Sequence, residues 1–198
     1  MKTNYSFFAF ISRMKNITRW SLMRNNTSEN IQEHSHMVAV IAHSLAVIRR
    51  EIFGIKSDPG LAASIALFHD SSEIFTGDLP TPIKYYDTEI MEAYKKVESV
   101  ASSKLLSALP PELRVAYKEI LSPSDKSEIM LLIKAADKLA AYIKCVEELK
   151  TGNLEFRLAA EQSKEKLLQL GMPEVKYFID NFIPAFELTL DELDFSFE

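Results

Sequence analysis

The sequence has little of what several other protein classes depend on. Cys145 is its one cysteine among 198 residues, so it can form neither an intramolecular disulfide nor a cysteine-based zinc site. This fits the reducing environment of the cytoplasm, where we expect the protein to be located. Only five glycines are present, which argues against a β-rich or linker-rich chain. Cys145 lies in a run with helical apolar spacing, and core packing is its expected role.

Long apolar runs and an excess of positive charge are also lacking. No run approaches the roughly 18 residues of a transmembrane helix. The apolar start of the chain resembles a short signal, but Ser12, Arg13 and Lys15 interrupt it, so we expect an amphipathic helix there. The formal net charge of −5 gives no broad attraction for nucleic acid polymers or anionic membranes. A small phosphorylated ligand remains compatible with this charge.

Helical spacing of hydrophobic residues dominates the rest of the chain. These residues make up 47% of the sequence, enough for a full core, and no strand pattern is evident. We therefore predict an all-α, single-domain helical bundle over residues 1–198, with a loosely ordered acidic tail from about Asp191. Ser28 or Asn30 is expected to cap the second helix. The predicted helices cover about residues 7–17, 31–50, 59–75, 88–109, 111–121, 126–150, 154–170 and 173–182.

The most informative stretch is Phe68-His69-Asp70-Ser71-Ser72-Glu73. On a helix, Glu73 would lie on the same side as His69 and Asp70, because residues three and four apart are neighbours. One imidazole and two carboxylates would then point to one place. Two of these groups can bind a divalent metal, and the third can hold or deprotonate an attacking water.

Two residues elsewhere in the chain complete a plausible ligand set. His34 lies on the inward stripe of the second predicted helix, together with Val38. Asp137 lies close to the apolar face of the helix predicted over residues 126–150, where a buried carboxylate needs a partner. Two nitrogens and two oxygens from His34, His69, Asp70 and Asp137 would leave room for water and a substrate oxygen.

Each of these residues also has a simpler explanation. His69 could be a core histidine bonded to a backbone carbonyl, and Asp137 could pair with Lys134 or Lys138 on a solvated face. Taken singly, each simpler explanation is favoured, but together, beside Glu73 and the Gly77-Asp78 loop, the residues favour a hydrolytic metal site.

The other candidates are less specific. His36 and His43 lie on a different face from His34, where surface or interface packing is favoured over a second metal pair. Trp20 could be a core anchor, or it could lie beside Arg19 so that an aromatic ring and a phosphate-binding guanidinium stand side by side. Glu29 and Glu33 suit the positive end of the second helix.

These residues resemble the H…HD…D pattern of the HD-domain phosphohydrolase superfamily, matched by His34, His69-Asp70 and Asp137. Further segments are similar to the bacterial YfbR-type 5′-deoxynucleotidases and extend the resemblance over nearly the whole chain. They are Arg19-Trp20, Leu22-Met23-Arg24, Glu33-His34-Ser35, His69-Asp70-Ser71-Ser72-Glu73, the run from Gly77-Asp78-Leu79-Pro80-Thr81-Pro82 to Tyr85, and Lys144-Cys145-Val146-Glu147-Glu148-Leu149.

The resemblance implies a function and a set of residue roles. It implies a cytoplasmic homodimer that removes the 5′-phosphate from deoxyribonucleoside monophosphates with one divalent metal, notably Co²⁺, with Mn²⁺ or another transition metal as alternatives. The metal ligands would be His34, His69, Asp70 and Asp137, and Glu73 would be the catalytic carboxylate. Arg19 would orient the phosphate, and Asp78 would line the nucleotide pocket. Beside the resemblance, our own hypothesis is that Asp78 holds the 3′-hydroxyl or assists the leaving oxygen. The residues expected to contact the nucleotide are Arg19, Trp20, His34, Asp70, Asp78, Leu79, Pro80, Thr81 and Asp137.

Two other classes of function remain open from the sequence. One is a different HD-domain enzyme, such as a cyclic-nucleotide phosphodiesterase or a nucleoside triphosphatase. The other is a non-catalytic helical module with a structural metal. The first would release a different product, and the second would keep its function after Glu73→Ala.

Overall fold

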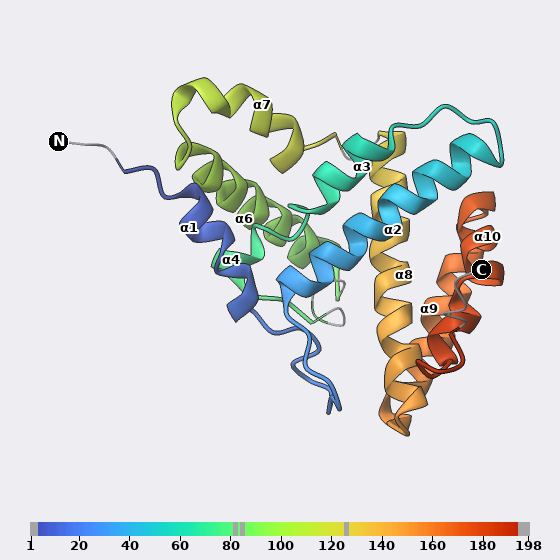
Figure 1. The fold of residues 1–198 in the computed structure, drawn as a ribbon. Coiled ribbons are helices and arrows are strands. Elements are labelled where there is room, and N and C mark those ends of the chain that lie inside the picture. Colours follow the sequence, from blue (N-terminus) through green and yellow to red (C-terminus); the bar gives the residue numbers. More distant parts are fainter. Residues whose placement is uncertain (1–3, 81–82, 84–85, 125–126, 194–198) are drawn as a thin grey trace.

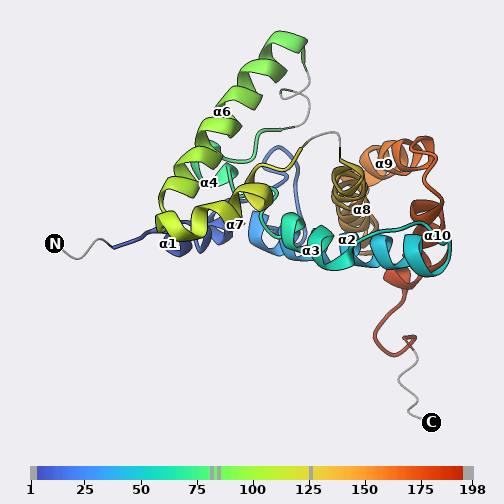
Figure 2. The same cartoon turned by 90° about the horizontal axis from the view of Figure 1, so that it is seen from above.

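A computed structural model describes residues 4–80, 83, 86–124 and 127–193, and over this part of the chain the fold is all-helical, as predicted. It contains no strand in the described ranges, where Thr18 and Asn30 form an isolated antiparallel bridge. Figures 1 and 2 show the arrangement. The α-helices are α1 (Phe7–Ile11), α2 (Ile31–Glu51), α3 (Pro59–Ala66), α4 (Glu73–Thr76), α6 (Thr88–Ser107), α7 (Pro111–Leu121), α8 (Glu128–Lys150), α9 (Arg157–Gln169) and α10 (Pro173–Asn181). The 3₁₀ turns are η1 (Met14–Asn16), η2 (Leu154–Phe156) and η3 (Ile183–Glu187).

Helices α2 and α8 form the centre of the molecule. Helix α2 packs against α3, α8 and α10, and α8 packs against α9. In Figures 1 and 2, α1, α4, α6 and α7 lie together at one end, while α9 and α10 lie at the other. The central pair therefore joins the two ends, and side chains from α2 and α8 can meet.

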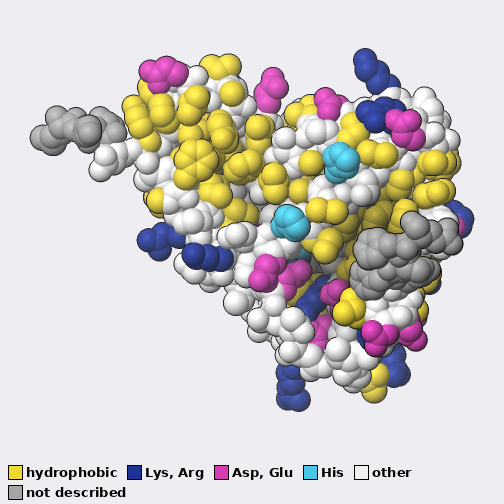
Figure 3. Space-filling view, in the orientation of Figure 1, with side chains coloured by type: hydrophobic (Ala, Val, Ile, Leu, Met, Phe, Trp, Pro, Cys, Tyr) yellow, Lys and Arg dark blue, Asp and Glu magenta, His cyan; other side chains and the backbone are white. Residues whose placement is uncertain are grey.

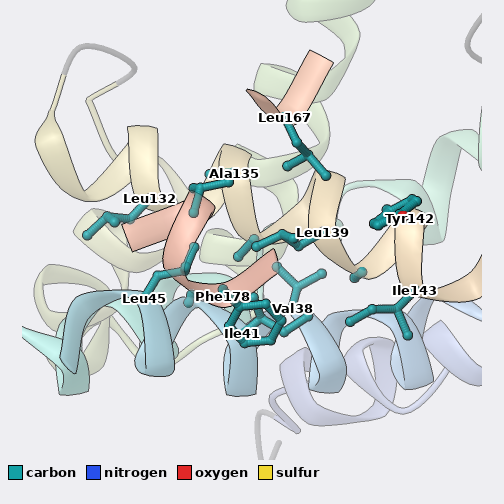
Figure 4. Packing of buried hydrophobic residues seen from close by; sticks show 14 of the residues in the cluster. Val38, Ile41, Leu45, Leu132, Ala135, Leu139, Tyr142, Ile143, Leu167 and Phe178 are labelled. Atoms are coloured by element: carbon teal, nitrogen blue, oxygen red, sulfur yellow. The ribbon is translucent and has the colours of Figure 1, made fainter. Parts of the chain in front are cut away.

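The core lies between these central helices (Figure 4). Val38, Ile41 and Leu45 of α2 face Leu139 and other buried residues of α8. The predicted inward stripe of α2 is therefore confirmed. Cys145 is also fully buried in this cluster, which confirms its expected packing role. A second, smaller cluster of buried residues lies at the other end and consists of Phe7, Leu105, Leu109 and Leu121.

Asn30 caps α2. Its side chain accepts hydrogen bonds from the backbone N–H groups of Gln32 and Glu33, while the Glu33 side chain accepts from the Asn30 N–H. This reciprocal capping box satisfies donors that a helix start leaves unpaired. Of the two predicted caps, Asn30 is thus correct and Ser28 is not.

The helix predicted over residues 59–75 is wrong in its second half. Helix α3 ends at Ala66, turns follow, and the short α4 begins at Glu73. In these turns the backbone N–H of Ser71 donates to the carbonyl of Phe68, and that of Glu73 to the carbonyl of Asp70. Bonds three residues apart wind the chain more tightly than an α-helix. His69, Asp70 and Glu73 therefore do not share the face of one continuous helix.

The other boundaries depart less from the prediction. The first predicted helix, residues 7–17, is divided into α1 and η1, and the Ser12 hydroxyl at the break donates to the carbonyl of Ala9. The helix predicted over 154–170 begins as η2. The predicted start near residue 126 and most of the acidic tail lie outside the described residues. Within the described ranges, we find no helix with the length and apolar character needed to cross a membrane.

Candidate functional site

The fold brings His34 and Asp137 together across the central helix pair. His34 is the fourth residue of α2 and is fully buried. Asp137 lies midway along α8, and its side chain is 41% exposed. Its Oδ1 lies 3.0 Å from Nε2 of His34. Asp137 is therefore directed into the predicted site, where His34 is its hydrogen-bond partner.

His69 and Asp70 reach the same place from the turns after α3. The Nδ1–H of His69 donates to the carbonyl of Ala66 over 2.7 Å. A carbonyl can only accept, so this bond leaves Nε2 without a proton in the neutral ring and fixes the ring orientation. The backbone-bonded histidine of the simpler explanation is thus present, but its second nitrogen faces Asp70 at 3.2 Å.

These groups fit a divalent transition metal. One ligand atom each from His34, His69 and Asp70 lie within 4.8 Å of one another. Nε2 of His34 is 3.7 Å from Oδ2 of Asp70, and Asp137 joins the group through His34. Nε2 of His69 is buried, and no described residue makes a well-formed hydrogen bond to it, although Oδ2 of Asp70 lies 3.2 Å away. Imidazole nitrogens and carboxylate oxygens at this spacing are typical ligands of such a cation.

Electrostatics also favour positive charge at this point. Burial alone would lower the pKa of His69, but the carboxylates of Asp70 and Asp137 outweigh it and raise the pKa to about 9. Burial would raise the pKa of Asp70, yet His69, His34 and Arg19 hold it well below its usual range. The hydrogen bond with His34 likewise keeps the pKa of Asp137 low against the effect of burial. Carboxylates that retain a proton on an imidazole would also attract a metal cation.

Arg19 enters the site from the loop before α2. Its side chain is 13% exposed, and Nη1 lies 3.5 Å from Oδ2 of Asp70. Burial opposes its charge, but the pKa of Arg19 is raised by Asp70, Asp137, Glu29 and Asp78. A guanidinium beside the cluster is well placed to bind a phosphate group.

The remaining predicted residues surround this cluster to different extents. Glu73 is buried at the first position of α4, one turn after Asp70. Asp78 is close enough for its charge to act on Arg19. Leu79 and Pro80 are half-buried in the following segment. Thr81 lies outside the described residues.

Trp20 has an unusual backbone conformation. Its φ angle is +57°, a left-handed value that costs a non-glycine residue free energy. The indole N–H donates to Glu29 over 3.0 Å, and the ring packs 5.4 Å from Phe156. Glu29 was expected to serve the start of α2, but its carboxylate instead turns to Arg19 and Trp20. Because these contacts lie in a loop, no periodic pattern of residues in the sequence predicts them.

Glu148 of α8 anchors the far side of the same loop. It accepts hydrogen bonds from the backbone N–H groups of Asn26 and Thr27 and from the side chain of Asn153. Lys144 donates both to Glu148 and to the carbonyl of Thr27. The Lys144–Leu149 segment resembled the family without a stated role, and this anchoring supplies one.

The Glu148 anchor predicts a measurable acid dependence of stability. Burial would raise the pKa of Glu148, but the bonds from Lys144, Asn153 and the loop lower it to about 2. Its stabilising effect is therefore complete above about pH 4.5 and is lost as the pH falls toward 2, which amounts to on the order of 2 kcal/mol. We expect Glu148→Gln to unfold at a lower urea concentration than wild type at pH 7. Its free energy of unfolding should also change less between pH 5 and pH 3.

An exposed glutamate of α9, Glu161, provides the control. Glu161→Gln should retain the wild-type dependence on pH. If the free energy of unfolding of Glu148→Gln depends on pH as that of wild type does, Glu148 does not anchor the loop.

The other two histidines lie away from the cluster. His36 and His43 are both exposed on α2, and histidine side chains are visible at the surface in Figure 3. Among the described residues, the potential metal-binding group is His34, His69 and Asp70, so the preference for surface positions at His36 and His43 is confirmed.

Comparison with known proteins agrees with this geometry. Residues 6–186 match the family described as "5′-deoxynucleotidase YfbR-like". A 5′-deoxynucleotidase of Vibrio parahaemolyticus is 48% identical over 188 residues, which cover 94% of this chain and 97% of the relative. One of Erwinia tasmaniensis is 47% identical and covers 94% and 95% of the two chains.

Solved structures give the same fold. The HD-domain phosphohydrolase of Listeria innocua superposes with a TM-score of 0.79 at 26% identity, over 91% of this chain and 88% of the other. The HD phosphohydrolase DatZ of cyanophage S-2L, bound to dA and one catalytic Zn²⁺, has a TM-score of 0.61 at 23% identity and covers 89% and 96%. The family match spans most of the chain, and the predicted HD-domain fold is confirmed. The chain belongs to the YfbR-like family of 5′-deoxynucleotidases.

Proposed function

We propose that His34, His69, Asp70 and Asp137 hold the one divalent cation with which this chain hydrolyses deoxyribonucleoside 5′-monophosphates to deoxyribonucleoside and phosphate. The observation that carries the proposal is the convergence of two imidazoles and the Asp70 carboxylate within 4.8 Å. Arg19 adds a positive charge at the edge of this cluster, 3.5 Å from Asp70. Membership of the family supplies the substrate class.

The residues divide the chemistry between them. A bound divalent cation would polarise the phosphoryl group and lower the pKa of water. Glu73, buried one turn after Asp70, takes the proton of the attacking water. Arg19 offsets the negative charge that develops on the phosphoryl oxygens. Asp78 holds the 3′-hydroxyl or assists the leaving oxygen.

Trp20 is the proposed wall against ribose. Its indole is bulky, half-buried and fixed beside Arg19 by their shared acceptor Glu29. We expect Trp20→Ala to admit the 2′-hydroxyl and to reduce the ratio of kcat/KM for dAMP over AMP by about tenfold or more. Phosphate release from the two nucleotides measures this ratio. An unchanged preference for deoxyribose would remove Trp20 from this role.

The proposal also covers the identity of the metal, the oligomeric state and the cellular location. Co²⁺ is the proposed activating metal, with Mn²⁺ and Zn²⁺ as alternatives that the same nitrogen and oxygen donors accept. A homodimer is supported by exposed hydrophobic side chains over α6 and α7, among them Leu113 and Val115 (Figure 3). The single cysteine supports a cytoplasmic location.

A product assay separates this proposal from other HD-domain activities. The chelated protein is supplied with Co²⁺, Mn²⁺ or Zn²⁺ and given dAMP, AMP, dATP and a cyclic nucleotide in parallel. We expect phosphate from dAMP, little from AMP, and none without metal. Triphosphate or pyrophosphate release from dATP, or opening of the cyclic nucleotide, with no phosphate from dAMP would refute the proposed substrate.

A further inference from the structure

The loop that carries Arg19 and Trp20 is closed at its base by backbone pairing. The N–H of Ile31 donates to the carbonyl of Ile17 over 3.0 Å, and that of Arg19 donates to the carbonyl of Glu29 over 2.9 Å. Glu29 therefore lies directly across from Arg19, although it comes ten positions later in the sequence. This pairing fixes where the backbone of Glu29 lies relative to that of Arg19.

One carboxylate oxygen of Glu29 holds both functional side chains of the loop. Its Oε2 accepts from Nε of Arg19 over 3.1 Å and from Nε1 of Trp20 over 3.0 Å. Its second oxygen, Oε1, lies 3.9 Å from the buried Nδ1 of His34. The carboxylate is thus shared by the residues proposed to contact phosphate, sugar and metal.

This sharing has a geometric consequence for the two side chains. Because Nε of Arg19 is occupied by Glu29, the guanidinium directs Nη1 toward Asp70. The strained backbone of Trp20 needs compensating contacts, and the indole bond to Glu29 is one of them. The guanidinium of Arg19, proposed to bind phosphate, and the indole of Trp20, proposed to exclude ribose, are therefore held relative to each other by one carboxylate oxygen of Glu29.

We infer that Glu29 is a positioning residue that fixes Arg19 and Trp20 relative to each other and so couples phosphate binding to rejection of ribose. This inference rests on the proposed function of that site. A purely structural role in closing the loop would alter stability, but it would leave the choice between the two sugars unchanged.

Glu29→Gln tests the inference because it removes the charge and keeps the size. Glu33→Gln is the matched control: it removes a neighbouring charge whose side chain serves the cap of α2. Trp20 is the only tryptophan, so emission excited at the red edge of the absorption band, where the seven tyrosines do not absorb, reports its indole alone. We expect Glu29→Gln, but not the control, to shift the emission and increase quenching by acrylamide in the metal-free protein.

The kinetic expectation is equally specific. Glu29→Gln should lower kcat/KM for dAMP by about 10- to 100-fold, the range typical of residues that orient a site. It should also lower the dAMP/AMP preference, whereas Glu33→Gln should keep both. If Glu29→Gln does not fold, Glu29→Asp withdraws the same carboxylate by one methylene and carries the same expectations.

The outcomes separate the inference from the proposed function. Unchanged fluorescence, or an unchanged preference between the sugars, in the Glu29 variant would overturn the positioning role while leaving the deoxynucleotidase proposal intact. Absence of phosphate release by the metal-loaded wild type would instead overturn the proposed function. Fluorescence would still test the anchoring of Trp20 in that case.

Discussion

Asp70→Asn is expected to reduce phosphate release from dAMP by at least about a hundredfold. Oδ2 of Asp70 lies 3.2 Å from Nε2 of His69 and 3.7 Å from that of His34, and it also faces Arg19. Removing its charge leaves two imidazoles and Asp137 to hold the cation. The variant should therefore lose bound metal as well as turnover. Metal analysis after gel filtration and a phosphate assay measure the two effects.

Asp180→Asn is the control for that change. Asp180 is exposed on α10, where it pairs with Lys176. The control should retain both metal and turnover. Wild-type metal content and rate in Asp70→Asn would show that Asp70 is not a ligand.

Glu73→Ala is expected to retain the metal but to lose turnover by about 10² to 10⁴-fold, the range of general acid–base catalysis. Glu73 is 5% exposed and begins α4 immediately after the turns that carry Asp70. We assign its carboxylate to accept the proton of the attacking water and not to bind the metal. Metal content, melting temperature and the rate constant with dAMP should be measured on the same preparation.

Glu73→Gln keeps the size of the side chain and isolates its charge. It should behave as Glu73→Ala does in turnover, with a melting temperature closer to wild type. Wild-type turnover in both variants, with metal still bound, would favour a structural metal and remove Glu73 from the chemistry.

The helical periodicity predicted the core well because burial repeats along each helix. Val38, Ile41 and Leu45 fall on one stripe of α2 and are all buried. The long α8 was predicted for the same reason. Periodicity failed after Ala66, where the apolar spacing continues but the backbone winds into turns. Local bonding over three residues leaves no mark in the spacing of hydrophobic residues.

The site was only partly accessible to sequence reasoning. The closeness of His69 and Asp70 follows from their adjacency, and the inward position of His34 follows from its place on the stripe of α2. The role of Glu29 does not follow from any such pattern, because it depends on how residues 17–19 pair with 29–31. Long-range pairing of a loop is decided by the tertiary fold. The residues that orient Arg19 and Trp20 therefore became visible only in the structure.

The most direct test is a crystal structure of the protein with Co²⁺, with the ion located by its anomalous scattering. We predict one ion per chain, bound by His34, His69, Asp70 and Asp137 at about 2.0–2.2 Å, the usual range for nitrogen and oxygen ligands of a similar cation. An ion located elsewhere, or Asp137 turned away from the imidazoles of His34 and His69, would contradict the account.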